Sequence, residues 1–515
     1  MVLYRKIGVV FLLAALLFSL SACTPGKGGA DVFTVLSSSE NKDLEPLLTE
    51  FAQKNEIDLR FEYTGSVIIS DMIKSSPQDY DAVWFSSSIW NASIPNSVLK
   101  NSKSISVNPV IFAVKESRYK ALGFSRDTVV NDLVEAVEAR NLKFLMPSVT
   151  QTNSGASAYI AFLNCLAGNP LVLTEEDLTS PALQERVEKL FKGVVKNYGG
   201  DEHLIDIFQE GDYDALASYE SSLIELNKQL IESNKEPLLF IYPSDGVSVS
   251  DSPFAYIDNN DSEKLEIFNK LQDFLLSADT QQKLEGLGRR TTYGGLVSNV
   301  EVFKESYGTD KNAYLSPIKY PASPVLKRAL ALYQDLFRKP AAVVFCIDLS
   351  FKVSAKPNKE LVAAVEKILI RELAVEDMIQ FSEKDKIFVI TFGDIFKKSF
   401  SIQSAADAEA SIFWIKDTVV MENGANIYEP VEHAITILND FDSEIYTKSI
   451  VLMAAGESRG DGFSPDTSYD IPVFSIMFGK ATPEQLDKIS RLTGGKTFDG
   501  RTDLIKAFKA IRGYN

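Results

Sequence analysis

The sequence predicts an α/β protein built from several globular units, and three observations support this fold class. From residue 31 to about 320, short apolar runs that end in Ser, Thr or Gly alternate with amphipathic stretches. From residue 341 onward a second alternating series begins, and its apolar runs are continuous, as a parallel sheet covered on both faces requires. The length of 515 residues and the mass of 57.0 kDa correspond to about three globular units.

The composition excludes several classes of function. With 45% hydrophobic residues the chain can fill several cores, so it is not disordered as a whole. The net charge is −17, and −19 without a leader that carries two basic residues, so we expect no nucleic acid partner. The two histidines, His203 and His433, lie far apart in sequence and leave little material for a His-rich metal site. Cys165 and Cys346 lie in apolar patterns, which indicates small buried side chains.

Residues 1–22 have the pattern of a secretion signal. Arg5 and Lys6 precede an apolar run that is too short to span a bilayer comfortably. The Leu-Ser-Ala-Cys sequence that ends at Cys23 resembles the bacterial lipobox, which implies a palmitate-bearing lipoprotein whose mature chain begins at that residue. Residues 23–30 form a Pro/Gly/Lys tether. We therefore expect a lipid anchor at the extracytoplasmic face of the cell membrane; the alternative is a plain secreted protein with an incidental cysteine.

Three predicted strands in the first half end in hydroxyl side chains. They span 34–41, 57–66 and 79–88, with helices predicted at 44–55 and 66–76. In an open α/β sheet ligands bind outside the carboxyl ends of the strands, so we expect these ends to converge on one crevice. The alternative is that the hydroxyl residues only form turns and helix caps.

A helix start in the next block favours a polar ligand. Thr150 to Gly155 supply short polar groups before an apolar helix that begins at about Ala156. The freed backbone N–H groups, with the side chains of Thr152, Asn153 and Ser154, are typical of a pocket for an anion or a polar headgroup. One helix terminus contributes only about 0.3 to 1 kcal/mol, so several must converge to bind usefully. Four further candidate ligand-binding residues lie at another pair of element ends: Tyr219, Glu220, Tyr242 and Asp245.

Four segments in one order carry a family resemblance: YTGSVIISDMIKSSPQDYDAVWFSSS, MPSVTQTNSGASAYIAFL, YESSLIELN and IYPSDG. They resemble the type 2 periplasmic solute-binding proteins of ABC transporters, near their molybdate-like branch. The resemblance implies a solute-binding domain at 31–325 whose two lobes close over a ligand, with lobe I at about 31–112 and 245–325 and lobe II at about 113–244. It implies an ABC permease as a partner. The implied ligand contacts are Ser37, Ser38, Thr64, Ser66, Ser87, Thr152, Asn153, Ser154 and Tyr219.

Glu220 fits a pocket for oxyanions poorly. A carboxylate beside a bound dianion is unfavourable unless it takes up a proton or meets an ammonium group on the ligand. In the alternative interpretation Glu220 faces the hinge and pairs with Arg289 or Arg290.

The second α/β series forms one further domain. A helical connector at 326–340 ends at Pro340, and the domain follows at 341–515. IPVFSIMFGK followed by TPEQLDKISRLTGGKTFDG resembles the von Willebrand factor A domain, which implies a Rossmann-like fold and a partner protein.

That family holds Mg²⁺ or Mn²⁺ with oxygen ligands on three loops, and hard divalent ions need such ligands. The five corresponding positions here are Asp348, Ser350, Lys352, Ala425 and Ala455. Only the first two keep an oxygen ligand of the family, and the ammonium of Lys352 would repel a divalent ion and pair with Asp348 instead. We therefore expect a degenerate site without metal and no cofactor. The alternative is that Lys352 turns into solvent and Asn426 or Glu457 repairs the site.

The leading hypothesis is a membrane-anchored lipoprotein that captures a small polar or anionic solute and carries a metal-independent interaction domain. The alternative is a cell-surface adhesion or assembly factor in which the solute-binding half is only a scaffold. We do not expect an enzyme, because the sequence has no nucleophile–base pair, Walker loop or His/Cys metal spacing.

Overall fold

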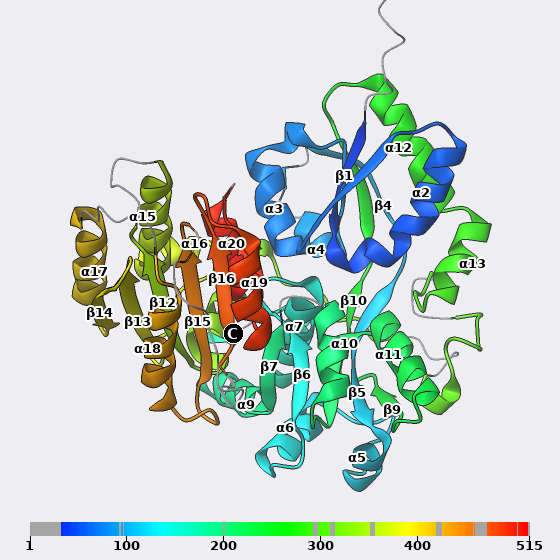
Figure 1. The fold of residues 1–515 in the computed structure, drawn as a ribbon. Coiled ribbons are helices and arrows are strands. Elements are labelled where there is room, and N and C mark those ends of the chain that lie inside the picture. Colours follow the sequence, from blue (N-terminus) through cyan, green and yellow to red (C-terminus); the bar gives the residue numbers. More distant parts are fainter. Residues whose placement is uncertain are drawn as a thin grey trace, which may run out of the picture.

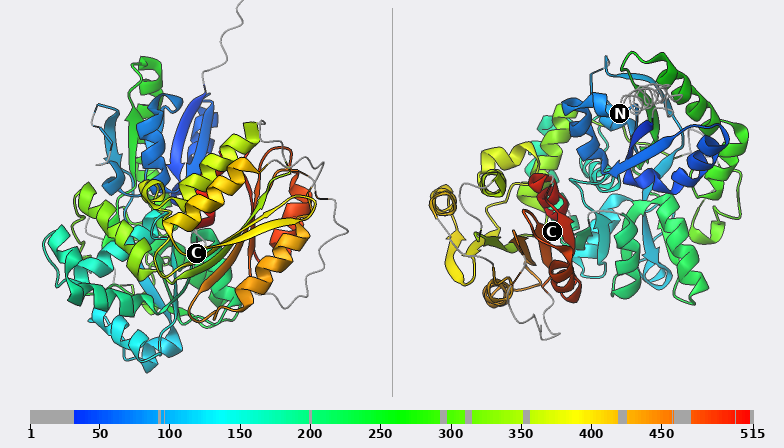
Figure 2. Two further views of the ribbon diagram at one scale, coloured as in Figure 1. Left: turned by 90° about the vertical axis from the view of Figure 1, so that its left-hand side faces the viewer. Right: turned by 45° about the horizontal axis from the view of Figure 1, so that its top comes forward.

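The computed structural model describes residues 32–91, 94–95, 97–198, 201–291, 297–309, 315–350, 356–418, 425–456, 458, 471–501 and 503–512. The leader, the tether with Cys23, Lys352 and Glu457 lie outside these residues. Within them, three β-sheets with flanking helices form two lobes and a C-terminal domain (Figures 1 and 2). The fold is thus α/β throughout. No helix in the described ranges is long and apolar enough to cross a membrane.

The sheet of lobe I is mixed. Its strands, in spatial order, are β2 (Leu59–Thr64), β1 (Phe33–Ser38), β3 (Ala82–Trp84), β11 (Pro253–Ile257) and β4 (Leu99–Ser104). Strand β1 is parallel to β2 and β3, whereas β11 is antiparallel to β3 and β4. The carboxyl ends of β1, β2 and β3 therefore lie at one edge of the sheet, as the sequence predicts.

Helices cover both faces of this sheet. Trp84, Phe254 and Phe268 pack on the face covered by α2 (Glu45–Lys54) and α12 (Ser262–Leu275). Ile69 in α3 (Ser66–Ser75) packs on the opposite face. The chain then continues into α13 (Ala278–Gly286).

Lobe II has a second mixed sheet. Its strands are β10 (Ser248–Ser250), β5 (Asn108–Lys115), β8 (Ala215–Tyr219), β6 (Phe144–Pro147) and β7 (Val194–Tyr198), with β9 (Leu238–Ile241) also paired to β5. One face is covered by α6 (Val130–Glu138), α7 (Asn153–Leu166) and α9 (Pro181–Phe191). The other face is covered by α10 (Asp201–Glu210) and α11 (Glu220–Glu232). Every residue of α7 is buried, so this helix is a central element of the lobe.

The two lobes are joined by short crossings. The chain passes from β4 of lobe I into β5 of lobe II, and it returns between β10 and β11. A third link follows α13, where the backbone N–H of Arg290 donates to the carbonyl of Val107 at 2.8 Å. Such short crossings are typical of two-lobed proteins in which the lobes hinge against each other.

The C-terminal domain has a six-stranded sheet in the order β14 (Phe396–Ile402), β13 (Lys386–Phe392), β12 (Ala341–Asp348), β15 (Thr447–Ala454), β16 (Val473–Met477) and β17 (Thr497–Asp499). All neighbours are parallel except β14, which is antiparallel at one edge. Helices α15 (Lys356–Leu369), α17 (Ala405–Asp417) and α20 (Leu504–Arg512) cover one face. Helices α18 (Tyr428–Asn439) and α19 (Pro483–Leu492) cover the other.

The connector belongs to the core of lobe II. It consists of α14 (Ser323–Leu332) and a π-helical turn, η4 (Tyr333–Phe337). The ring of Tyr333 lies 5.5 Å from that of Tyr159 and 5.4 Å from that of Phe191, both in lobe II. The hydroxyl of Tyr159 donates to the carbonyl of Ala329 at 2.9 Å. The connector is therefore packed onto lobe II along its length.

Three elements differ from the sequence prediction. The amphipathic pattern of residues 361–375 predicts one continuous helix, but the helix is broken at Ile370, whose backbone is extended, and α16 (Arg371–Glu376) starts after it. The pattern of residues 271–286 predicts one helix, but Ser277 divides it and caps α13 by accepting a hydrogen bond from the N–H of Thr280. The edge strand β14 was not predicted, because its lysines and serines interrupt the apolar pattern.

Candidate functional site

The strand ends of lobe I bring four predicted serines to one edge of its sheet. Ser37 and Ser38 end β1, Ser87 follows β3, and Ser66 begins α3. All four are buried. The hydroxyls of Ser38 and Ser66 hydrogen-bond each other, and the N–H of Ser86 donates to Ser38 Oγ at 3.2 Å. The ends of β1 and β3 and the start of α3 therefore meet at one place, as the sequence predicts for the strand ends.

Asn153 is the centre of the contact between the lobes. Thr152 caps α7 by accepting a hydrogen bond from the N–H of Gly155 at 3.0 Å, which leaves Asn153 as the first helical residue. Its Nδ2 donates to Tyr219 Oη at 2.5 Å and to Ser250 Oγ at 2.8 Å within lobe II. Its Oδ1 accepts from Trp90 Nε1 of lobe I at 2.6 Å. One side chain therefore joins polar groups from both lobes.

The backbone of Asn153 binds a carboxylate from lobe I. Its N–H donates to Glu40 Oε1 at 3.0 Å, so a side chain of the protein itself occupies the helix start at which the sequence predicts an anion. The other oxygen, Glu40 Oε2, is shielded from solvent and has no hydrogen-bond partner among the described residues. Burial raises the pKa of Glu40 above its ordinary value, although hydrogen bonds from its own backbone and from Asn153 act in the opposite direction.

Glu40 is the site residue that sequence reasoning missed. It directly follows the serines that end β1, in a position that an α/β junction often gives to a turn residue. The only signal was a carboxylate next to the predicted crevice.

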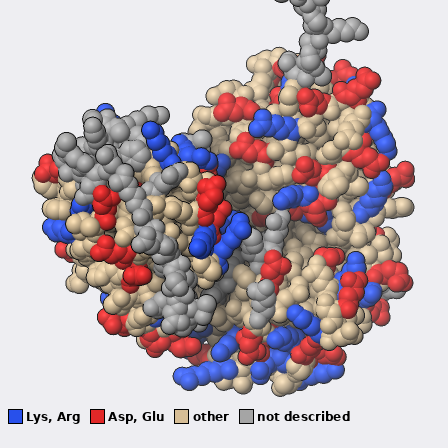
Figure 3. Space-filling model, viewed as in Figure 1, with Lys and Arg blue, Asp and Glu red and all other residues tan. Residues whose placement is uncertain are grey.

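A groove of about 1190 Å³ opens beside this cluster. Its walls come from both lobes and from the C-terminal domain, and they include Glu40, Thr64, Gln151, Thr152, Lys496 and Phe498. Of the predicted contact residues, Thr64 and Thr152 line the groove, whereas the buried serines and Asn153 bond to other groups of the protein. Acidic and basic side chains are interspersed over the face seen in Figure 3, so no field of one sign covers it.

The lobes touch each other at one edge of the groove. A Cβ atom added to Gly65, at the start of α3, would lie 2.0 Å from the backbone oxygen of Gln151 in lobe II. No real side chain fits at that distance, so the residue at 65 must be glycine for the lobes to approach this closely.

Glu220 does not line the groove and is neutralised by Arg290. Arg290 Nε donates to Glu220 Oε2 at 2.5 Å, and Arg290 Nη2 donates to Oε1 at 2.6 Å. The hydroxyl of Tyr242 donates to the same carboxylate, and all of Glu220 and Arg290 is buried. This is the hinge pairing that was the alternative interpretation of Glu220. Because Arg290 already compensates the carboxylate of Glu220, an ammonium group on a ligand is not required to stabilise it.

Asp245 also serves the interior of lobe II. Its two carboxylate oxygens accept from the N–H of Val130 at 3.2 Å each, at the start of α6. Burial raises the pKa of Asp245. Glu220, Tyr242 and Asp245 therefore lie apart from the groove, in contrast to Thr64 and Thr152.

In the C-terminal domain, backbone N–H groups bond both carboxylate oxygens of Asp348, the first position of the predicted degenerate metal site. Asp348 Oδ1 accepts from the N–H of Ser350 at 2.8 Å, and Oδ2 accepts from the N–H of Ala455 at 2.9 Å. Ala425 and Ala455 are fully buried. Asn426 Oδ1 accepts from the N–H of Tyr428, the first residue of α18, at 3.1 Å.

No group of three or more His, Cys, Asp or Glu residues suited to a metal occurs in the described part of the chain. Lys352 and Glu457 fall outside it.

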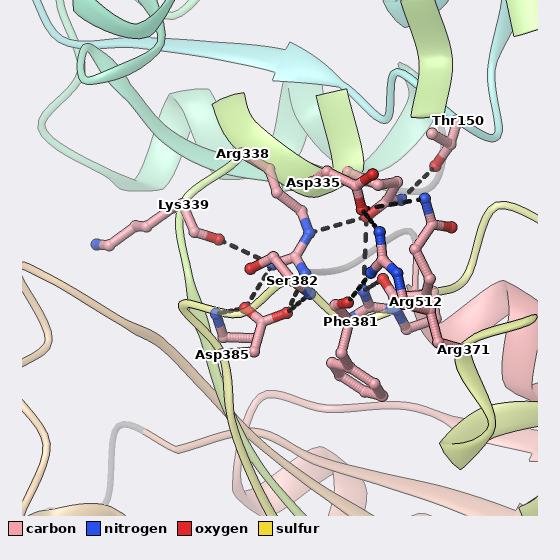
Figure 4. Close-up of polar contacts among 12 residues, drawn as sticks. Thr150, Asp335, Arg338, Lys339, Arg371, Phe381, Ser382, Asp385 and Arg512 are labelled. Carbon is pink, nitrogen blue, oxygen red and sulfur yellow. Dashed lines mark hydrogen bonds and ion pairs between the residues drawn. The ribbon is translucent and has the colours of Figure 1, made fainter. Parts of the chain in front are cut away.

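The C-terminal domain is attached to the loop that begins α7. Gln334 Nε2 of the connector donates to Thr150 Oγ1 at 3.1 Å, and Arg338 Nε donates to Gln334 Oε1 at 2.8 Å. Arg338 Nη1 in turn donates to Asp385 Oδ1 at 2.9 Å in the C-terminal domain (Figure 4). A second guanidinium, that of Arg512 in α20, packs in the same network over the ring of Phe381.

Helix α20 contacts both lobes. Gln151 Nε2 of lobe II donates to the carbonyl of Lys509, and Lys506 Nζ lies 3.9 Å from Glu62 Oε1 of lobe I. Burial lowers the pKa of Arg512 to about 9, and the neighbouring Arg338 adds to this effect. The loop that carries Thr150, Gln151 and Asn153 is therefore bonded to all three bodies of the molecule.

Comparison with known proteins gives two family matches. Residues 33–290, half of the chain, match the model of the bacterial extracellular solute-binding protein family. Residues 342–507 match the von Willebrand factor type A domain. No curated protein matches the sequence.

Several solved structures match the first part of the chain. They include the periplasmic binding protein AfuA from Actinobacillus pleuropneumoniae with fructose-6-phosphate, at 15% identity over 60% of this chain and 99% of that chain, with a TM-score of 0.42. The sulfate-binding protein SubI from Mycobacterium tuberculosis H37Rv matches at 17% identity over 57% and 95%, with a TM-score of 0.40. A periplasmic thiamin binding protein matches at 13% identity over 59% and 98%, with a TM-score of 0.44.

Proposed function

Because this chain belongs to the bacterial extracellular solute-binding protein family, and a von Willebrand factor type A domain follows that part, we propose that it captures a small polar solute outside the cytoplasm and passes it to an ABC permease. The observation that carries the proposal is the position of Asn153, whose amide joins Trp90 of lobe I to Tyr219 and Ser250 of lobe II. Polar groups that bond across two lobes are available to a solute when the lobes separate.

Hydroxyl and amide groups favour a polar solute more than an anionic one. An anion at the start of α7 would have to compete with the Glu40 carboxylate, which already accepts from the N–H of Asn153. Neutral polar groups can replace hydrogen bonds of Ser38, Ser66 and Asn153 without adding a second negative charge.

The proposal is tested by isothermal titration of the purified protein with neutral, cationic and anionic solutes, and with cell-wall fragments. Heat of binding from one class, abolished by Asn153→Leu and retained in the surface variant Gln403→Leu, is the expected result. Failure of all classes to bind would refute solute capture.

We further propose that Cys23 carries a lipid and holds the protein at the extracytoplasmic face of the cell membrane. The lipobox-like Leu-Ser-Ala-Cys sequence supports this. Radioactive palmitate is expected to label the protein, and Cys23→Ala is expected to remove the label and release the protein from membranes. Labelling that persists in Cys23→Ala would refute the anchor.

The C-terminal domain is proposed to bind a partner protein without a metal ion. Both oxygens of Asp348 accept from backbone N–H groups, and two positions that supply oxygen ligands in the family are the buried Ala425 and Ala455. These residues do not fit a hard divalent ion. Capture of a partner from cell envelopes is expected to be equal in EDTA and in Mg²⁺; dependence on Mg²⁺ would contradict the proposal.

One observation favours a second candidate function, an adhesion or assembly factor. The buried serines and Asn153 bond to one another and to neighbouring groups, as they would in a rigid scaffold. In that case a partner captured from envelopes survives Ser66→Trp and Asn153→Leu. In a solute-dependent protein these changes abolish solute binding.

A further inference from the structure

The side chain of Glu40 is partly exposed, and no counter-ion among the described residues contacts its carboxylate. Its Oε1 accepts one hydrogen bond from the N–H of Asn153, and its Oε2 is shielded from solvent and accepts none among the described residues. No described Lys or Arg nitrogen lies within 4.0 Å of it. A buried ionised carboxylate is unfavourable unless a cation or several donors compensate it.

The cation whose charge acts on Glu40, Arg289, forms its ion pair with a different carboxylate. Arg289 donates to Asp43 Oδ1 at 2.7 Å and to Asp43 Oδ2 at 3.0 Å. It also donates to the backbone oxygen of Glu40, but not to its side chain. Arg289 therefore stabilises the negative charge of Glu40 by Coulomb attraction, without a direct hydrogen bond to the carboxylate.

A second acceptor without a partner lies on the same side of lobe I. Ser86 follows β3, is 3% exposed, and its Oγ has no hydrogen-bond partner in the described structure. Its backbone N–H is used by Ser38 Oγ, which fixes the residue beside the serine cluster. The hydroxyl of Ser86 lies close to the Glu40 carboxyl and acts to lower its pKa. The Ser86 hydroxyl faces the Glu40 carboxyl and can donate to it, so the negative charge at the junction of the lobes is only partly compensated.

Glu40 also lines the groove between the three bodies. A solute in that groove reaches the carboxylate when the lobes separate and the contact with Asn153 is released. The groove is large enough for a molecule the size of a sugar derivative, since ligand sites commonly measure about 300 to 1,000 Å³.

We propose that the solute carries an ammonium group and that Glu40, assisted by Ser86, recognises it. The inference rests on the proposed capture of a solute and names its chemical class. An ammonium group supplies both the missing charge and the missing donors, and a neutral hydroxyl supplies only a donor. A second anion beside Glu40 would meet a like charge.

The raised pKa of Glu40 has the same physical origin. Desolvation is its largest cause, and a bound cation would act against it. The groups that face Glu40 are the N–H of Asn153, the hydroxyl of Ser86 and, at greater distance, the guanidinium of Arg289.

The test uses the full protein and three matched probes: glucosamine, glucose and glucuronate. They share a sugar ring and differ in charge, so binding by titration calorimetry and thermal shift isolates the ammonium. We also expect mass spectrometry of the protein purified from envelopes to identify a bound solute with an amine. In wild type, the amine probe is expected to bind about 10- to 100-fold more tightly than the neutral one, which is the effect of one ion pair in a partly buried site.

Two variants assign the effect to Glu40. In Glu40→Gln, the affinity for glucosamine is expected to fall to the affinity for glucose. Glu301→Gln, which makes the same chemical change at an exposed position of the same groove, is expected to leave the preference intact. Ser86→Ala is expected to lower the affinity for glucosamine by a smaller factor. It therefore provides a second test if Glu40→Gln folds poorly.

The outcomes separate this inference from the proposed function. A co-purified or titrated solute that is anionic or neutral, with unchanged affinity in Glu40→Gln, would overturn the inference and leave solute capture standing. If other solutes bind but no amine does, only the inference is overturned. If no solute co-purifies and neither the three probes nor the other solute classes bind, solute capture itself is refuted. Tight binding of glucuronate gained in Glu40→Gln would show that Glu40 excludes anions without recognising amines, and would also overturn the inference.

Discussion

Gln334 in the connector and Thr150 in lobe II share a buried hydrogen bond of 3.1 Å between Nε2 and Oγ1. The bond matters because Thr150 lies three positions before Asn153, and Gln334 is held from the other side by Arg338. The C-terminal domain is therefore coupled to the loop at the centre of the contact between the lobes. Substitutions at this junction are therefore expected to change the stability of both the solute-binding lobes and the C-terminal domain.

We predict that Gln334→Ala lowers the free energy of unfolding by about 1 to 3 kcal/mol, because it leaves the Thr150 hydroxyl and a donor of Arg338 buried without partners. Urea unfolding followed by fluorescence measures this. Gln403→Ala, at an exposed position, is the matched control and should change stability by less than about 0.5 kcal/mol. A double mutant with Thr150→Val that costs the sum of the two single changes would contradict the coupling.

We predict that Asp385→Asn is strongly destabilising, by roughly 3 to 5 kcal/mol, because it leaves the buried guanidinium of Arg338 unpaired. Burial opposes the charge of Asp385, but Arg338 outweighs it and holds the pKa of Asp385 below its ordinary value of 3.8. A lowered pKa contributes stability that is present above pH of about 4 and is lost as the pH falls further. Wild type should therefore lose stability below pH of about 4 more steeply than the variant. Parallel pH profiles of the two proteins would argue against the ion pair.

Glu40→Gln should stabilise the protein at neutral pH, even though it removes the proposed ligand contact. The pKa of Glu40 is raised, so the folded state binds the proton more tightly than the unfolded chain and the ionised form is the unfavourable one. The gain should therefore be present above the raised pKa and disappear below the ordinary value of 4.5, where both states are protonated. Thermal unfolding of both proteins at several pH values between 4 and 8 measures this difference in stability. A variant less stable than wild type at pH 7 would show that Glu40 is a structural anchor.

Gly65→Ala is predicted to force the lobes apart, since the added Cβ would lie 2.0 Å from the backbone oxygen of Gln151. We expect a loss of about 1 to 3 kcal/mol and a larger radius of gyration in small-angle X-ray scattering. Gly286→Ala serves as the control, because no atom lies within 4 Å of its added Cβ and the residue ends helix α13. An unchanged scattering curve for Gly65→Ala would mean that the lobes are separate in solution.

The sequence allowed the parallel parts of the fold to be predicted, because buried strands such as β12 are continuous apolar runs. It also indicated polar residues at element ends: Ser38 bonds Ser66 within lobe I, and Asn153 bonds Trp90 across the lobes. The break at Ile370 could not be predicted, because the apolar period continues through it without Gly or Pro. Glu40 was missed for a similar reason: nothing local shows that a carboxylate will reach the start of a helix 113 residues away.

The contact between Gln151 and Lys509 spans 358 residues of chain. Contacts of such long sequence separation form late, because the entropy of closing the intervening loop must be overcome first. The groove gains its third wall, with Lys496 and Phe498, only after the C-terminal sheet has assembled. The groove is therefore completed last, and a fragment ending at the connector would expose lobe surfaces that the C-terminal domain covers in the complete chain.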